Sequence, residues 1–271
     1  MGDAPHEKLG PQQPEFPREP SDVPLVLVPV SAEDVERRSR RIRLAVGACA
    51  LCVLAGAGLL YKRWVDPLHA QESYDSGVRL LQIARYDQAI LSFDRSTALK
   101  PDMVEAYLMR ARAYIGLSKP ELAIRDFTRV LDLRPMDTQA LVERGLTYLE
   151  LKNFRDALSD ANRAVEADAN FAKAYNLRGL VVRAMGDPHK ALQDFTRAVQ
   201  LMPNEDNYYQ RGATYQMLGD HRRAIVDFDQ VIAYRPDGAP GYFARAESRR
   251  AIGDAEGAKA DHQQGRNIDG R

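Results

Sequence analysis

Small and apolar residues recur along this chain at a fixed spacing of about 34 residues. The spacing is clearest for an alanine that marks six units: Ala89, Ala123, Ala157, Ala191, Ala224 and Ala258. Twelve residues before each alanine lies another small residue: Gly77, Ala111, Gly145, Gly179, Gly212 and Ala246. Four residues after it, four of the units carry phenylalanine. A period near 34 is typical of a stacked array of helical repeats, so the pattern predicts an all-α fold.

A second hydropathy feature precedes the repeats. Residues 44–61 contain no charged side chain, and 18 helical residues span about 27 Å, enough for a bilayer core. Five arginines lie just before this run, between residues 37 and 43. We interpret residues 31–66 as a basic juxtamembrane segment followed by one transmembrane helix. Three other interpretations fit this run less well: a cleaved signal peptide, a lipoprotein and a buried soluble helix. The reasons are that 43 residues precede the run and that arginines flank it.

The charge bias around the predicted span indicates its orientation. Five arginines precede it and two cationic residues, Lys62 and Arg63, follow it. The positive-inside rule then places the N-terminus in the cytoplasm and the repeats across the membrane. In a bacterium this is a single-pass inner-membrane protein with periplasmic repeats. Ala48, Cys52 and Gly56 form a small-residue ridge that would allow two anchors to pack, which leaves homo-oligomerisation open.

Residues 1–30 differ in composition from the rest of the chain. They contain seven of the fifteen prolines, and proline supports neither helix interiors nor sheet ladders. We therefore expect a disordered, Pro-rich tail over residues 1–30.

The repeated units resemble the tetratricopeptide repeat, a helix–turn–helix unit. Two of them read AYLMRARAYIGLSKPELAIRDFTRVLDLRP and AYNLRGLVVRAMGDPHKALQDFTRAVQLMP. The resemblance implies a right-handed superhelical solenoid of six repeats over residues 67–271, preceded by the tail and the transmembrane helix. The repeats are taken as 70–103, 104–137, 138–171, 172–204, 205–238 and 239–271. The third unit lacks its Phe and Pro, so we expect it to pack more loosely, and the polar last unit is expected to be a cap.

Two positions of the unit vary together. Position 7 is arginine in units two to six, at Arg110, Arg144, Arg178, Arg211 and Arg245. Position 23 is aspartate in the same units, at Asp126, Asp160, Asp194, Asp227 and Asp261, and unit one has serine at both. We infer an ion pair between the two helices of each of these units, worth about 0–1 kcal/mol if exposed. The alternative is an arginine ladder that binds acidic ligands.

Composition and motifs argue against catalysis and nucleic-acid binding. The net charge is zero, with 38 basic and 38 acidic residues, which disfavours nucleic-acid binding. The two cysteines lie in the apolar run, and the five histidines lack the spacing of metal ligands. The sequence contains no phosphate-binding loop, nucleophile elbow or HExxH motif. We expect no enzyme activity, no cofactor and no metal.

Members of the resembled family usually bind extended peptides or partner helices on the face made by the first helices of their repeats. Carried onto this chain, that face comprises Tyr74, Val78, Leu81, Leu108, Arg112, Val142, Leu146, Asn176, Leu180, Arg183, Tyr209, Gln216, Phe243 and Arg250. We expect about half of them to be open to solvent. Among the positions that form the carboxylate clamp of chaperone-binding members, only Asn176 has a matching residue type. Arg112 and Arg183 lack an aspartate counterpart and are predicted to be free to meet a ligand carboxylate.

These observations favour a membrane-anchored scaffold that recruits a protein partner, in bacterial envelope assembly, secretion or export. Two alternatives stay open. One is an organelle-surface import receptor with cytosolic repeats, and the other is a non-catalytic scaffold subunit of an enzyme complex.

Overall fold

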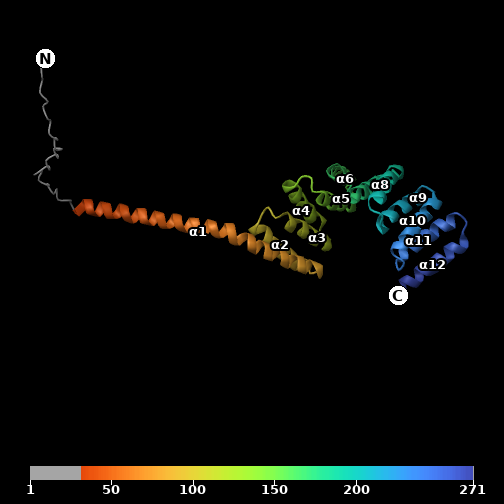
Figure 1. Ribbon diagram of the computed structural model, residues 1–271, viewed down its shortest axis with the longest axis horizontal. Helices are drawn as coiled ribbons and strands as arrows, with labels where there is room; N and C mark the ends of the chain where they lie inside the picture. Colours follow the sequence, from red (N-terminus) through yellow and green to blue (C-terminus); the bar gives the residue numbers. More distant parts are fainter. Residues whose placement is uncertain (1–31, 271) are drawn as a thin grey trace, which may run out of the picture. The chain divides into compact units, whose positions relative to one another are not determined.

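The computed structural model describes residues 32–270, which form helices and connecting turns without a strand. The chain divides into two units, residues 1–59 and 60–271, which are described separately. The helices, labelled in Figure 1, are α1 (Ala32–Gln82), α2 (Tyr86–Leu99), α3 (Val104–Gly116), α4 (Pro120–Leu133), α5 (Thr138–Glu150), α6 (Phe154–Ala167), α7 (Ala172–Ala184), α8 (Pro188–Leu201), α9 (Glu205–Met217), α10 (His221–Tyr234), α11 (Ala239–Ala251) and α12 (Ala255–Asp269).

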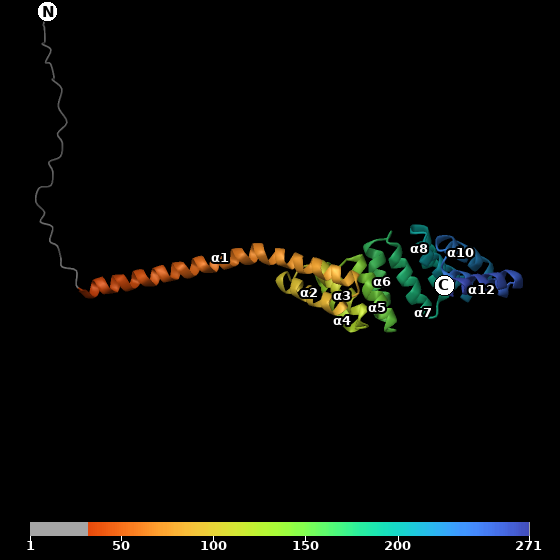
Figure 2. The same ribbon diagram turned by 90° about the horizontal axis from the view of Figure 1, so that it is seen from below.

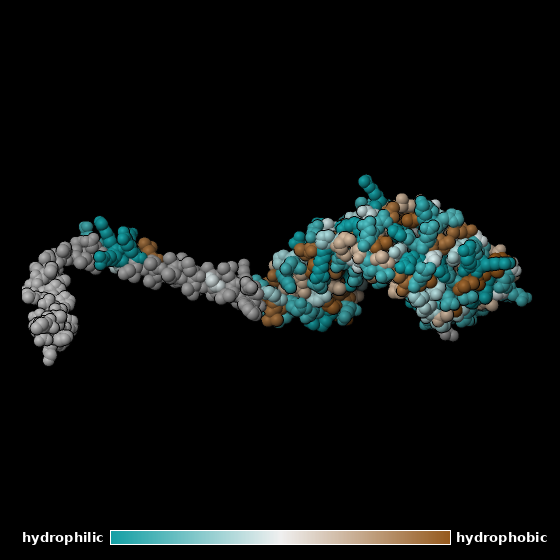
Figure 3. All heavy atoms as spheres, turned by 45° about the horizontal axis from the view of Figure 1, so that its top comes forward, coloured by the Kyte–Doolittle hydropathy of each residue, from teal (hydrophilic) through white to brown (hydrophobic). Residues whose placement is uncertain are grey.

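The described part of the first unit is the beginning of α1. Its exposed side chains from Glu33 to Arg43 are hydrophilic, as Figure 3 shows. Among the described residues, no helix holds a stretch that is both long and apolar enough to cross a membrane. The predicted span, residues 44–61, lies largely outside the residues whose side chains are described, and the predicted tail, residues 1–30, lies outside the described residues altogether.

The second unit is an array of helix pairs. The end of α1 pairs with α2, and five further pairs follow from α3–α4 to α11–α12 (Figures 1 and 2). Each second helix also packs against the first helix of the next pair. The all-helical array predicted from the 34-residue period is therefore confirmed. Helix α1 runs without interruption through Pro67, so the first repeat begins within a helix rather than after a loop.

Close contact between the two helices holds each pair together. A Cβ added to Gly179 would lie 2.8 Å from the ring of Phe195, and one added to Gly212 would lie 2.9 Å from the ring of Phe228. The marker alanines, such as Ala191, are completely buried, apart from slight exposure of Ala258 in the last pair. Small residues are needed here because a larger side chain would hold the helices apart.

The third repeat is packed as well as the others, so the expectation of looser packing is wrong. Ala161 stands where four repeats have phenylalanine. Leu177, from the first helix of the following repeat, fills the vacant space, and its Cδ2 lies 2.6 Å from where a Cβ on Gly145 would be. Leu141, Ala161 and Leu177 are all at most 1% exposed and belong to one apolar cluster. The neighbouring repeat supplies the missing bulk.

The turns inside the repeats follow from their sequence. Gly186 and Gly219 end the first helix with positive φ angles of 93° and 76°, which glycine adopts without strain. The next residue, Asp187 or Asp220, accepts a hydrogen bond from the backbone N–H three residues later and so caps the second helix. Side chains cap four other helices in the same way: Asp137, Asn153, Asn204 and Asp254.

The last repeat exchanges the usual large and small residues between its helices. Its first helix supplies Phe243, and its second helix supplies Gly265, whose added Cβ would lie 2.6 Å from that ring. Only Ala258, Asp261 and Gly265 of α12 are buried. The rest of the helix is exposed or partly exposed, as predicted for a terminal repeat.

We predict that Ala191→Leu destabilises the array by about 1–3 kcal/mol, because the larger side chain overfills the contact between α7 and α8. Urea unfolding followed by circular dichroism measures the change. Ala251→Leu, at an exposed position of α11, is the control and should leave stability nearly unaltered. Equal unfolding midpoints for the two variants would contradict the assignment of Ala191 to a close helix contact.

Candidate functional site

The predicted ion pairs between the helices of each repeat are present in repeats two to six. The distances from Nη2 of arginine to Oδ1 of aspartate are 2.6 or 2.7 Å. In every pair Nε of the arginine also donates to the second carboxylate oxygen, so the contact is bidentate. The pairs are Arg110–Asp126, Arg144–Asp160, Arg178–Asp194, Arg211–Asp227 and Arg245–Asp261.

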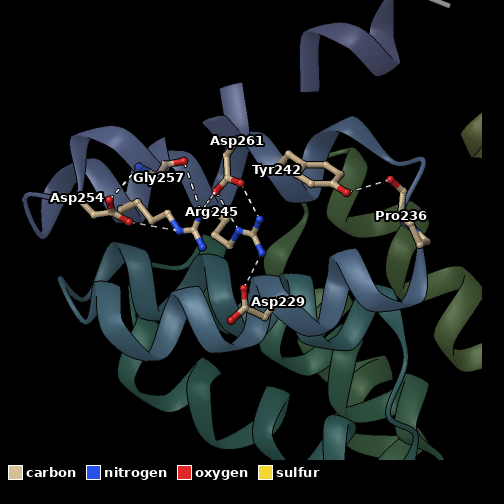
Figure 4. Close-up of polar contacts among 8 residues, drawn as sticks. Asp229, Pro236, Tyr242, Arg245, Asp254, Gly257 and Asp261 are labelled. Carbon is tan, nitrogen blue, oxygen red and sulfur yellow. Dashed lines mark hydrogen bonds and ion pairs between the residues drawn. The ribbon is translucent and has the colours of Figure 1, made fainter. Parts of the chain in front are cut away.

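Four of these arginines also bind the preceding repeat. Nη1 of Arg245 donates to Asp229 at 2.7 Å, as Figure 4 shows, and Nη1 of Arg110 donates to Asp94 at 2.6 Å. Arg144 and Arg178 reach Thr128 and Asn162 at the equivalent position. The guanidinium groups therefore join consecutive repeats as well as the two helices within a repeat.

Tyrosines cover the same arginines. The guanidinium of Arg245 lies 5.7 Å from the ring centroid of Tyr242, and the hydroxyl of Tyr242 donates to the carbonyl of Pro236 (Figure 4). Arg110 lies over Tyr107 in the same way. Such stacking is a cation–π contact, which strengthens as water is excluded.

These pairs are largely buried, so the value of about 0–1 kcal/mol for exposed pairs does not apply to them. The side chain of Asp160 is 3% exposed and that of Arg144 is 12% exposed. The hydrogen bonds that Arg178 and Arg211 donate to Asp194 and Asp227 raise the pKa values of these arginines above the ordinary arginine value. The donors of these arginines are used inside the array, so they do not form a ladder for acidic ligands.

A pocket of about 530 Å³ lies between the first helices of repeats three, four and five. It contains four of the residues predicted for the binding face: Val142, Leu146, Asn176 and Leu180. Its other lining residues are Gln139, Glu143, Phe171, Lys173, Met202, Asn204, Asp206 and Asn207. We call this the α5–α7–α9 pocket.

The structure distributes the remaining predicted face residues unevenly. Leu108, Val142 and Asn176 are buried, whereas Leu146 and Arg250 are exposed. Leu180 is partly exposed and lines the α5–α7–α9 pocket. The other predicted residues are also partly exposed but lie outside this pocket: Tyr74, Val78, Leu81, Arg112, Arg183, Tyr209, Gln216 and Phe243.

Arg112 and Arg183 are not free, contrary to the prediction. Arg112 donates to Glu143 of the next repeat, with Nε 3.0 Å from Oε2, and this hydrogen bond raises its pKa. Arg183 donates to the side chain and carbonyl of Gln210 and to Thr214, also in the next repeat. It has no carboxylate partner among residues 32–270, and burial lowers its pKa. Both arginines thus hold neighbouring repeats together.

Two of the polar residues that line the pocket, Asn176 and Asn207, are hydrogen-bonded to each other. Nδ2 of Asn176 donates to Oδ1 of Asn207 at 2.7 Å, and Nδ2 of Asn207 donates to the carbonyl of Met202 at the end of the preceding repeat. Asn207 was missed in the sequence, although a signal was present. The equivalent residue is small in repeats two, three, four and six, for example Ala174 and Gly241, and repeat four has 33 residues where repeats one, two, three and five have 34.

No side-chain cluster among residues 32–270 has the composition of a metal site. Two buried polar atoms there lack a partner, Nδ1 of His221 and Oγ of Ser248, and neither lines a described pocket.

Family models described as tetratricopeptide repeat match residues 74–135, 108–170, 172–205 and 206–238. These matches cover more than half of the chain. The chain belongs to the tetratricopeptide repeat family. No curated protein matches it.

Solved structures share the fold at low sequence identity. The array is similar to a tetratricopeptide repeat protein from Parabacteroides merdae, with a TM-score of 0.61 and 23% identity over 74% of this chain and 79% of that one. It is also similar to PilF of Pseudomonas aeruginosa, with a TM-score of 0.66 and 17% identity over 73% and 91%. PilW, described as a widely conserved type IV pilus biogenesis factor, gives 0.66 and 18% over 72% and 91%. These likenesses show the fold alone.

We predict that Asp160→Ala destabilises the array by about 3–5 kcal/mol, because it leaves the buried guanidinium of Arg144 without its partner. Thermal and urea unfolding measure the loss. Asp132→Ala removes an exposed carboxylate that forms no ion pair in the described part of the chain, and it should cost far less. Similar stabilities for the two variants would show that the inter-helix pairs do not support the fold.

Proposed function

We propose that this chain is a membrane-anchored scaffold whose α5–α7–α9 pocket binds an extended segment or a helix of a protein partner. The observation that carries the proposal is the composition of this pocket. Val142, Leu146, Phe171, Leu180 and Met202 offer an apolar surface between repeats three and five. Apolar pockets with a few placed polar groups are typical binding sites.

The polar groups of the pocket suit a peptide backbone. Both hydrogens of the Asn176 amide point to Asn207 and Asp206, so its carbonyl oxygen is the group left to accept from a ligand N–H. Glu143 and Asp206 on one hand and Lys173 on the other provide charges of both signs at the rim. The combination favours a segment that presents apolar side chains and main-chain hydrogen bonds.

The proposed setting is the bacterial envelope, with the repeats in the periplasm. The support is the charge-free run at residues 44–61 with arginines before it. PilW shows that a pilus biogenesis factor has this fold, which is compatible with a role in envelope assembly, secretion or export. The tetratricopeptide repeat fold is generally a non-catalytic scaffold, and we propose no enzyme activity for this chain.

We predict that the double variant Leu146→Asp with Leu180→Asp loses partner recovery in a crosslinking pull-down from detergent-solubilised membranes. Loss of apolar burial at two side chains should weaken binding by more than about tenfold. Val226→Asp with Met217→Asp is the matched control, since both residues are exposed and lie outside the α5–α7–α9 pocket. Unchanged recovery with a folded pocket variant would contradict the proposed site.

Protease treatment of spheroplasts tests the proposed topology. We predict that the repeats of the full chain are digested from outside while a tag at the N-terminus survives. An organelle-surface receptor with cytosolic repeats predicts the reverse pattern. Protection of the repeats until the membrane is broken would therefore overturn the periplasmic assignment.

A further inference from the structure

The last repeat carries cationic side chains at positions that are apolar in the other repeats. Lys259 replaces a residue that is Ile or Leu in repeats one to five, and His262 replaces a residue that is Phe in four of them. Arg266 replaces a residue that is Thr, Leu, Val or Ile. In repeat five this last position is Ile232, which contacts Gly241 of the next repeat. No repeat follows the sixth among the described residues, so the face of α12 that carries Arg266 is uncovered.

These side chains line one pocket of about 380 Å³ between α11 and α12. Arg250 of α11 adds a third full charge, and Ala255 and Ala258 are among the smaller residues that line it. Nη2 of Arg250 lies 3.0 Å from Nε2 of His262. We call this the α12 basic pocket.

The carboxylates near this end of the array are used elsewhere. Asp261 is held by Arg245 and Arg249, and Asp254 lies 3.6 Å from Arg249. Glu256 and Asp269, also on α12, do not line the α12 basic pocket.

Within residues 32–270, none of the three cations of this pocket forms an ion pair: Arg250, Lys259 and Arg266. A terminal repeat needs a polar outer face for solubility, but that requirement is met by either sign of charge. The full charges that line the α12 basic pocket are all positive, although Glu256 and Asp269 lie close by on α12, and this lining suits an acidic ligand.

We propose that the α12 basic pocket binds an acidic segment of a protein partner. Lys259 and Arg266 are seven residues apart on one helix, which separates them by about 10 Å along its axis. A single phosphate does not reach both, whereas carboxylates on one face of an extended chain, two or four residues apart, are spaced by about 7 or 13 Å, and the long Lys and Arg side chains span the difference. The planar guanidinium group of Arg250 can donate two parallel hydrogen bonds to a further carboxylate. The proposal rests on the proposed function only in taking the partner to be a protein.

Fluorescence anisotropy with a short fluorescein-labelled polyglutamate peptide tests the proposal on the detergent-solubilised full chain. We expect Lys259→Glu with Arg266→Glu to weaken binding by about tenfold or more. Both residues are exposed, so the fold is retained, and circular dichroism checks it. The matched control is Arg155→Glu with Arg222→Glu, which makes the same change in net charge at exposed sites on α6 and α10 and should bind within about twofold of the unaltered chain.

The outcomes separate the alternatives. Equal affinity for the two double variants, or no peptide binding by the unaltered chain, overturns the proposal. Tight binding of inorganic phosphate that displaces the peptide also overturns it, because the pocket then belongs to a small anion. Selective loss with the Lys259 and Arg266 variant supports it. The test uses a peptide of known sequence, so its result does not depend on the α5–α7–α9 pocket. Chains with substitutions in that pocket should bind polyglutamate normally.

Discussion

Every repeat depends on the close approach of its two helices at one small residue on each. At Gly145 the backbone carbonyl of Ala157 lies 3.5 Å from where a Cβ would be, and the space above such glycines is filled by a large side chain. That side chain comes from the second helix in repeats one, four and five, from the next repeat in repeat three, and from the first helix in repeat six. Each repeat therefore requires that the space beside its small residue is filled, whereas the position in the chain of the residue that fills it varies.

The buried arginines extend this local contact into an array. Each links its own two helices through a bidentate carboxylate, and most reach a polar side chain of the repeat before. Arg112 and Arg183 make similar links toward the repeat after. Since repeats contact only their neighbours, the stability of the array is the sum of such local terms. The arginines that resemble ligand contacts in the sequence are therefore part of the scaffold.

Both proposed binding surfaces lie where the repeats depart from their own pattern. The α5–α7–α9 pocket lies where repeat four is one residue short and Asn207 replaces a small residue. The α12 basic pocket lies where apolar positions become cationic. On the face drawn in Figure 3, hydrophilic and hydrophobic residues of the array are interspersed. An array of equal units thus gains specificity from its irregular positions.

The sequence by itself determined the fold, because a 34-residue period with fixed small and apolar positions admits few architectures. It also determined the arginine–aspartate pairs, whose partners lie 16 residues apart within one repeat. It grouped Val142, Leu146, Asn176 and Leu180, which the structure brings together in the α5–α7–α9 pocket. The tertiary structure alone decided the burial of those pairs, and also the pairing of Arg112 with Glu143, which lies 31 residues along the chain. The reason is that contacts between repeats depend on how successive hairpins stack, and the repeat pattern does not encode that geometry residue by residue.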